Sequence, residues 1–210
     1  MIRYFRKIWI FVIIGSLLII ISTFIFGVVT FRYEQKLIQV QENIEELKNK
    51  EAESRYYFDI ANEQLRISVL HNSILKSGFN TNKEQTKVIR NLYIKNLMSV
   101  FWRLFLATGQ SEMKLHEVDE IKKIEKNATE GDNSALQKLN SYMLGFTQQN
   151  TKYRDNLVIK MKKLRTSEAG LKRNIIIWRN MALVFQILGL LLILLKEVPP
   201  KPNNLSKNES

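Results

Sequence analysis

The stretch that decides the fold is IIIWRNMALVFQILGLLLILLKE, residues 175–197. A helix of about 20 apolar residues crosses the hydrocarbon core of a bilayer. The uninterrupted apolar part, residues 181–195, is short for this, so we extend the span over residues 175–196. Arginine near a helix end reaches the headgroups and tryptophan prefers the same depth, so Trp178 and Arg179 are predicted interfacial anchors.

A second apolar segment, residues 8–30, reads IWIFVIIGSLLIIISTFIFGVVT and contains no charge. It follows the basic flank 1–7 and lacks a cleavage site of small residues, which predicts an uncleaved signal anchor. Trp9 and Tyr33, near its two ends, are further predicted interfacial anchors. The polar, proline-containing tail 197–210 is predicted to be disordered.

Gln186 lies within the second span, where an amide without a partner is unfavourable. Antiparallel pairing of the spans would bring it to the depth of Ser22 and Thr23, so we predict an interhelix contact worth roughly 0.6 to 2 kcal/mol. The small residues Thr23 and Gly27 on the first span, and Gly189 on the second, are expected to let the backbones approach. The alternative is a tolerated lone glutamine.

The region 31–174 between the spans carries helical periodicity. One seam predicts a nearly continuous helix to about Lys76, interrupted in pattern by Glu51 and Ser54. Gly78 then suits a C-cap, and Thr81 with Glu84 suits a capping box for the next helix. The apolar residues of the seam are Leu37, Val40, Ile44, Leu47, Phe58, Ala61 and Leu65.

Three more helices are predicted. Residues 82–107 are apolar on most sides, which favours a buried helix of a bundle over one lying on the membrane. Ser111 is the expected N-cap of a third helix, and Asp132, Asn133 or Ser134 caps a fourth that runs on through the second span. The polar row of the second helix comprises Asn91, Lys95, Ser99 and Arg103. The seam of the fourth comprises Leu139, Met143, Phe146, Asn150, Tyr153, Leu157, Lys160, Leu164, Ser167, Leu171, Asn174, Trp178, Met181, Phe185, Leu188, Leu192 and Leu195.

These elements predict an all-α protein: a two-span transmembrane helical hairpin whose long helices extend as an antiparallel coiled-coil stalk, with a membrane-proximal four-helix bundle in residues 31–174. The layout resembles the span, four-helix sensor bundle and span of bacterial chemoreceptors and sensor kinases. It departs from them because we expect no cytoplasmic output domain after the second span.

The chain offers few groups for catalysis, with two histidines and no cysteine. Glu112, His116 and Glu120 share a predicted helix face, but HEVDE lacks the second histidine of the H-E-x-x-H zinc motif, so we favour a solvated face. Arg66 and His71 in RISVLH have an R-x4-H spacing that resembles the nuclease motif of the helical HEPN family. Ile67 departs from that motif, and chance spacing in an ordinary helix is the reading we favour. We predict no catalytic, cofactor or metal site.

The formal net charge of +12 raises the possibility of nucleic-acid binding. The charges are scattered, however, and the densest basic stretch, residues 160–173, directly precedes the second span, where basic residues meet anionic lipid or set topology. The expected partners are therefore the lipid bilayer and either a second copy or another membrane protein. No small-molecule ligand can be identified from the sequence.

We therefore expect a non-enzymatic, membrane-anchored protein acting in sensing, scaffolding or oligomeric assembly. The alternative is a cytosol-facing membrane effector, a defence or toxin component or a helical nuclease. Charges flanking the first span (Arg3, Arg6 and Lys7 against Arg32 and Lys36) place the N-terminus inside, whereas Lys172, Arg173 and Arg179 against Lys196 favour the loop inside. We follow the first span, which puts both termini in the cytoplasm and the bundle outside a prokaryotic cytoplasmic membrane.

Overall fold

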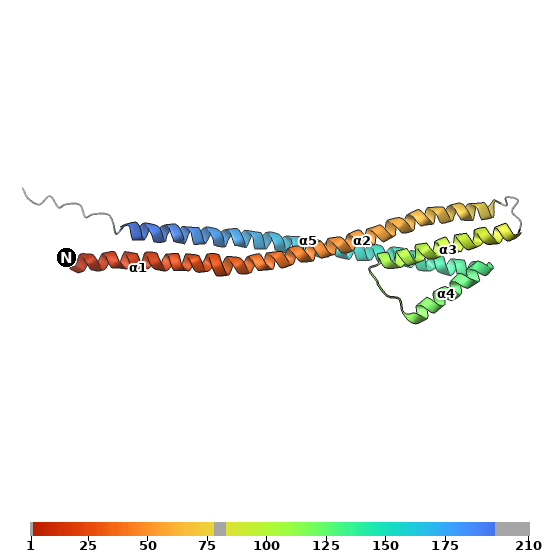
Figure 1. Cartoon of the computed structure of the whole chain (residues 1–210), viewed down its shortest axis with the longest axis horizontal. Helices are drawn as coiled ribbons and strands as arrows, with labels where there is room; N and C mark the ends of the chain where they lie inside the picture. Colours follow the sequence, from red (N-terminus) through yellow and green to blue (C-terminus); the bar gives the residue numbers. More distant parts are fainter. Residues whose placement is uncertain (1, 78–82, 196–210) are drawn as a thin grey trace, which may run out of the picture. The chain divides into compact units, whose positions relative to one another are not determined.

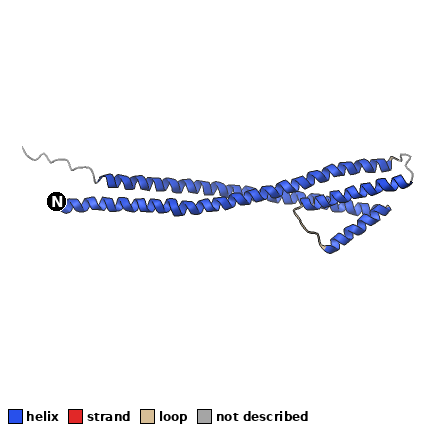
Figure 2. Ribbon diagram, in the orientation of Figure 1, coloured by secondary structure: helices blue, strands red, loops and turns tan. Residues whose placement is uncertain are grey.

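The computed structural model describes residues 2–77 and 83–195, with the backbone alone for residues 2–8. Figure 2 shows helices joined by loops throughout this part of the chain, so the all-α prediction is confirmed for it. The elements in Figure 1 are α1 (Ile2–Phe24), a π-helix η1 (Ile25–Thr30), α2 (Phe31–Lys76), α3 (Lys83–Ala107), α4 (Leu115–Glu130) and α5 (Asn133–Leu194).

The chain divides into two compact units. Unit 1 comprises Met1–Glu42 with Arg165–Ser210, and unit 2 comprises Asn43–Leu164. Two helical stretches are long and apolar enough to cross a membrane, with mean hydropathy of 2.8 and 1.9 over their most apolar windows. One of them lies in the continuous helix Trp9–Lys76 and the other in Asn133–Leu194. The expected continuity of the fourth helix into the second span is confirmed.

Helix α3 lies at the centre of the core of unit 2. Its core-facing apolar residues are almost fully buried, including Phe101 at 0% exposure, whereas Val88 and Leu92 near its start are exposed. Phe101 also makes edge-to-face contacts with Trp102 and Phe146, at centroid distances of 5.2 Å each. The preference for a buried helix over a membrane-lying one therefore agrees with the burial of α3. The other buried core residues are Ala61 of α2, Ile121, Ile124 and Ala128 of α4, and Ala135, Leu139 and Met143 of α5.

The start of α4 differs from the prediction, and the start of α5 selects one of the three predicted N-caps. Helix α4 begins at Leu115 and not after Ser111, because the Glu117 carboxylate accepts a hydrogen bond from the Lys114 backbone N–H at 3.1 Å and caps the helix there. At α5, Asp132 is the cap, and its carboxylate accepts from the Ser134 backbone N–H at 2.8 Å. The predicted C-cap Gly78, the capping-box residue Thr81 and the tail 197–210 lie outside the described residues.

Two of the expected seams need correction. Ser54 does not interrupt the α2 seam, since it is 2% exposed and its hydroxyl donates to the Ala107 carbonyl at 2.6 Å. Leu65 is exposed. On α5, Asn150 is buried as expected, but the polar residues predicted further along the seam are exposed, because adjacent apolar residues are turned inward in their place. The exposed residues are Lys160, Ser167 and Asn174, and the buried ones are Met161 and Ile175.

Candidate functional site at the predicted membrane boundary

In unit 1 the two apolar segments run antiparallel and touch through small residues. A Cβ built on Gly15 would lie 2.6 Å from the Gly189 carbonyl oxygen, and one built on Gly189 would lie 2.7 Å from that of Gly15. The backbones are therefore in contact at a point where only glycine fits. Gly189 approaches Gly15 here, and not the predicted Gly27.

Seven residues from each glycine, a hydrogen bond joins the same two faces. The Ser22 hydroxyl donates to the Ala182 carbonyl at 2.7 Å, and both residues are buried. Two contacts at matched intervals on α1 and α5 define one continuous interface. The interface passes through Ala182 and Gly189, whereas the large neighbouring residues Met181 and Leu188, which the apolar pattern had placed on the seam, are exposed.

The predicted contact between Gln186 and Ser22 or Thr23 is not formed. The Ser22 hydroxyl is engaged by Ala182, the Thr23 hydroxyl donates to the carbonyl of Ile19 in its own helix at 2.9 Å, and Gln186 is exposed. The interface residue next to Gln186 is Phe185, so Gln186 lies about 100° further round the helix. Gly27 is exposed as well, with open space around its Cβ position.

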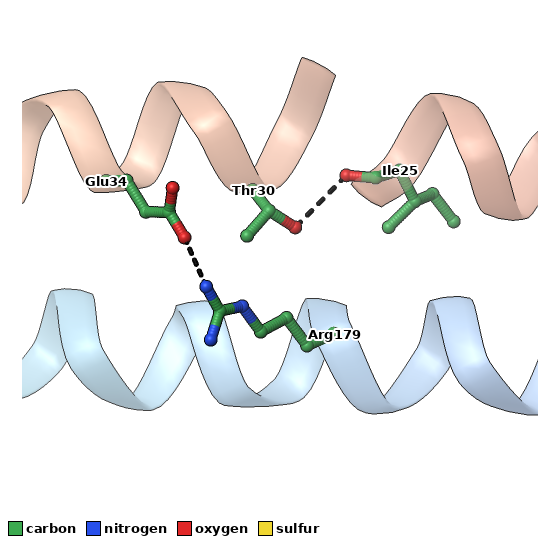
Figure 3. Close-up of polar contacts among 4 residues, drawn as sticks. All are labelled: Ile25, Thr30, Glu34 and Arg179. Atoms are coloured by element: carbon green, nitrogen blue, oxygen red, sulfur yellow. Dashed lines mark hydrogen bonds and ion pairs between the residues drawn. The ribbon is translucent and has the colours of Figure 1, made fainter. Parts of the chain in front are cut away.

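The π-helix η1 keeps one side of the long helix turned toward α5. Interface residues before it, Gly15 and Ser22, are seven apart, and the residues after it, Thr30 and Leu37, are also seven apart. The step from Ser22 to Thr30 is one residue longer, and the extra residue is absorbed by the wider π turn. The Thr30 hydroxyl donates to the Ile25 carbonyl at 3.1 Å within this turn (Figure 3).

An ion pair joins the two helices just beyond the π-helix. The Arg179 guanidinium donates to the Glu34 carboxylate at 2.5 Å, with side-chain exposures of 51% and 37% (Figure 3). Helical side chains lean toward the N-terminus of their own helix. Glu34 therefore leans back toward the first apolar segment, Arg179 leans out of the second, and the two charges meet.

The predicted anchors gather around this pair only in part. Trp178 and Tyr33 are partly buried, next in sequence to Arg179 and Glu34. Trp9 lies at the far end of the first apolar segment and is 57% exposed. Glu34 had no sequence signal of its own, because a single carboxylate after a span is common. The signal that could have found it is the need of Arg179 for an opposite charge at the same depth.

A second polar contact lies further along the same helix pair. The Glu168 carboxylate accepts hydrogen bonds from Lys172 at 2.7 Å, on its own helix, and from Gln41 of α2 at 3.2 Å. The bond from Lys172, followed by that from Gln41, lowers the pKa of Glu168 below its ordinary value. Polar links between the helices therefore occur on both sides of Leu37.

Unit 2 holds a cleft of about 980 Å³ lined by residues of α3, α4 and α5. Phe105 and Phe146 contribute apolar surface, while Glu120 and Tyr142 contribute polar groups. Desolvation, followed by the charge of Glu120, raises the pKa of Tyr142. The volume is typical of small-molecule pockets, but the polar groups here do not form a recognisable catalytic set.

The residues considered as candidate catalytic or metal-binding groups do not lie together in the structure. Arg66 is directed to Glu63 at 3.8 Å, whereas His71 contacts the amide of Asn96 on α3 at 3.1 Å. Glu112 lies before the start of α4, so it does not share a helix face with His116. Among the described residues, no group of three potential ligands is placed to hold a metal ion.

Comparison of the chain with protein families, with known proteins and with solved structures gives no match.

Proposed function

We propose that this chain is a non-enzymatic, membrane-anchored helical-bundle protein that acts in sensing, scaffolding or oligomeric assembly. Residues 8–30 and 175–196 form a two-span hairpin, and residues 31–174 form a bundle and antiparallel stalk outside the bilayer. Both termini lie in the cytoplasm of a prokaryotic cell, with the bundle on the other side of its cytoplasmic membrane.

One observation carries the proposal: the apolar part of unit 1 is arranged inside out relative to a water-soluble protein. Gly15, Ser22, Ala182 and Gly189 are buried between the helices. Most large apolar side chains point away from the partner helix, as in Ile20 at 64% exposure, although Ile25 and Ile175 are buried. Helix pairs in lipid pack through small and polar residues in this way, because lipid tails solvate the large apolar side chains as well as a protein core does.

The Glu34–Arg179 pair supports the same proposal. It lies four residues beyond Thr30 on one helix and four residues into the expected second span on the other. In a bilayer the lean of Arg179 brings its charge out toward the surface, where the carboxylate of Glu34, leaning back toward the first span, offsets it.

The proposal is tested by Ile20→Lys with Ile67→Lys as the matched control. Ile20 is near the middle of the first span, where lysine raises the free energy of insertion by about 2.5 to 3.5 kcal/mol. Ile67 is also exposed, but lies in unit 2. We expect the natural chain and Ile67→Lys to remain in the membrane pellet after alkaline carbonate extraction, and the pelleted amount of Ile20→Lys to fall.

Release of the natural chain into the supernatant would refute the membrane anchor. Equal membrane retention of both lysine variants would show that Ile20 does not face lipid, and would contradict the inside-out reading of unit 1.

A further inference from the structure

Gln186 is the polar residue of the second apolar segment that the helix pair leaves outside. Its side chain is exposed, and no other described residue is hydrogen-bonded to it. The register of the pair, with Ser22 opposite Ala182 and Gly15 opposite Gly189, places residue 18 opposite Gln186. The Ser22 and Thr23 hydroxyls are therefore four to five residues away along the first helix, and each donates to a backbone carbonyl. This inference rests on the proposed membrane function, since in water an exposed glutamine needs no partner.

In a bilayer, Gln186 cannot reach water. It is near the midpoint of residues 175–196, and at 1.5 Å per residue both ends of the span are roughly 15 Å away. A glutamine side chain covers only a small part of this distance, unlike the long side chain of Arg179 nearer the end. Its amide therefore has to find a partner at its own depth, from outside the helix pair.

A second copy of the chain meets this requirement directly. Copies inserted in the same orientation carry Gln186 at the same depth, and a two-fold axis along the membrane normal brings the two residues face to face. The amide is both donor and acceptor, so two glutamines can satisfy each other reciprocally. A different membrane protein would need a matching polar group at the same depth.

The surroundings of Gln186 suit helix packing. Leu183 and Leu190 lie three residues before and four residues after it and are 50% and 48% exposed, which is the spacing of one helix face. Arg179 continues this face toward the membrane surface, where Glu34 offsets its charge. Two copies would therefore not bring uncompensated arginines together.

We propose that a second copy of this chain docks along α5 through reciprocal Gln186 amide hydrogen bonds, with Leu183 and Leu190 packing on either side. The hairpin is then the unit from which a parallel dimer is built within the bilayer.

The natural chain has no cysteine, so single cysteines report the contact without background. Leu183→Cys and Leu190→Cys lie on the proposed face. Val184→Cys and Leu191→Cys are matched controls, since both natural residues are 52% exposed and lie one residue, or about 100°, away. Oxidative cross-linking in membranes should give at least several-fold more disulfide-linked dimer at positions 183 and 190 than at 184 and 191.

The role of the amide is tested by adding Gln186→Leu or Gln186→Asn to Leu183→Cys. Leucine suits a lipid-facing helix, so membrane insertion should persist while the cross-linked dimer falls several-fold. Asparagine retains an amide and should retain more of the dimer. Equal cross-linking at all four positions, stronger cross-linking at the controls, or no effect of Gln186→Leu would overturn the proposal.

Carbonate extraction of the same membranes distinguishes failure of the dimer proposal from failure of the proposed membrane function. A chain that stays in the membrane but does not cross-link at positions 183 and 190 contradicts the dimer alone. A chain that is released from the membrane contradicts the proposed function.

Discussion

Substitution of Gly189 by alanine provides a quantitative test of the helix crossing. The added Cβ would lie 2.7 Å from the Gly15 carbonyl oxygen and 2.9 Å from the Ile19 Cγ1 atom. Ordinary contacts to a Cβ begin near 3.4 Å, so the helices must separate by roughly 0.7 Å against a backbone atom, which cannot rotate away as a side chain can. Overpacking of this kind costs about 1 to 3 kcal/mol.

The matched control is Gly170→Ala, on the same helix and in the same unit. Its Cβ would meet nothing within 4 Å, and alanine favours a helix over glycine by up to about 1 kcal/mol. Thermal unfolding of detergent-purified protein, followed by circular dichroism, measures both effects. The gain in helix propensity is common to both substitutions, so the overpacking cost appears as the difference between them. At roughly 2 to 4 °C per kcal/mol for a chain of this size, the midpoint of Gly189→Ala should lie about 2 to 12 °C below that of Gly170→Ala. A midpoint for Gly189→Ala equal to or above that of Gly170→Ala would refute the close crossing.

Three further predictions follow from individual contacts. Glu34→Gln should lower the free energy of unfolding by about 0.2 to 1 kcal/mol, because the carboxylate that pairs with Arg179 is lost from a partly exposed site. This loss, measured by thermal unfolding, should be smaller in high salt. A loss that does not depend on salt would contradict an ionic contribution. Ser54→Ala should cost about 1 to 3 kcal/mol in the same assay, since it leaves a buried carbonyl unpaired, and a neutral effect would remove this bond from the account. Hydrogen bonds lower the pKa values of Glu168 and Asp132 below their ordinary values of 4.5 and 3.8. Their contributions to stability are therefore complete above the ordinary pKa values and are lost as the pH falls through the lower pKa values of the folded state. An unfolding midpoint that rises as the pH is lowered from 5 to 3 would contradict this direction.

The helical segments were predictable because they rest on local signals. Long apolar runs and the 3,4 spacing of residues such as Ile44 and Leu139 are visible in the sequence, and both are buried. The start of α4 was harder to predict from the sequence. Ser111 is a good cap by residue type, but the Glu117 carboxylate reaches back to Lys114 and stabilises a later start, and competition between two caps depends on geometry.

The helix interface in unit 1 was harder to predict because hydrophobicity is the wrong guide there. The apolar pattern selected Met181 and Leu188, whereas Ala182 and Gly189 make the contact. Under the proposed membrane function, large apolar side chains gain little by turning inward, and close backbone approach decides the face. The phase shift at the π-helix adds to the difficulty, because one inserted residue between Ser22 and Thr30 moves every later contact.

The candidate site was predictable only in its parts. Arg179 and Trp178 were identified from their position at the end of an apolar run, and Gly189 from its size. Glu34 depends on a partner 145 positions away in the chain, and no local pattern points to it. Gln186 was recognised as unusual, but its orientation followed only from the rotation of α5 about the crossing at Gly189.

The central claim, that two spans place the bundle and the C-terminus on opposite sides of a membrane, is tested most directly by labelling single cysteines in intact cells. Ser134→Cys and Ser210→Cys would be treated separately with a membrane-impermeant maleimide, with labelling after lysis as the measure of total reactivity. We predict labelling at position 134 in intact cells and at position 210 only after lysis. Labelling at 210 alone would keep the two spans but put the bundle in the cytosol. Labelling of both positions in intact cells, or protection of both until lysis, would contradict the two-span account.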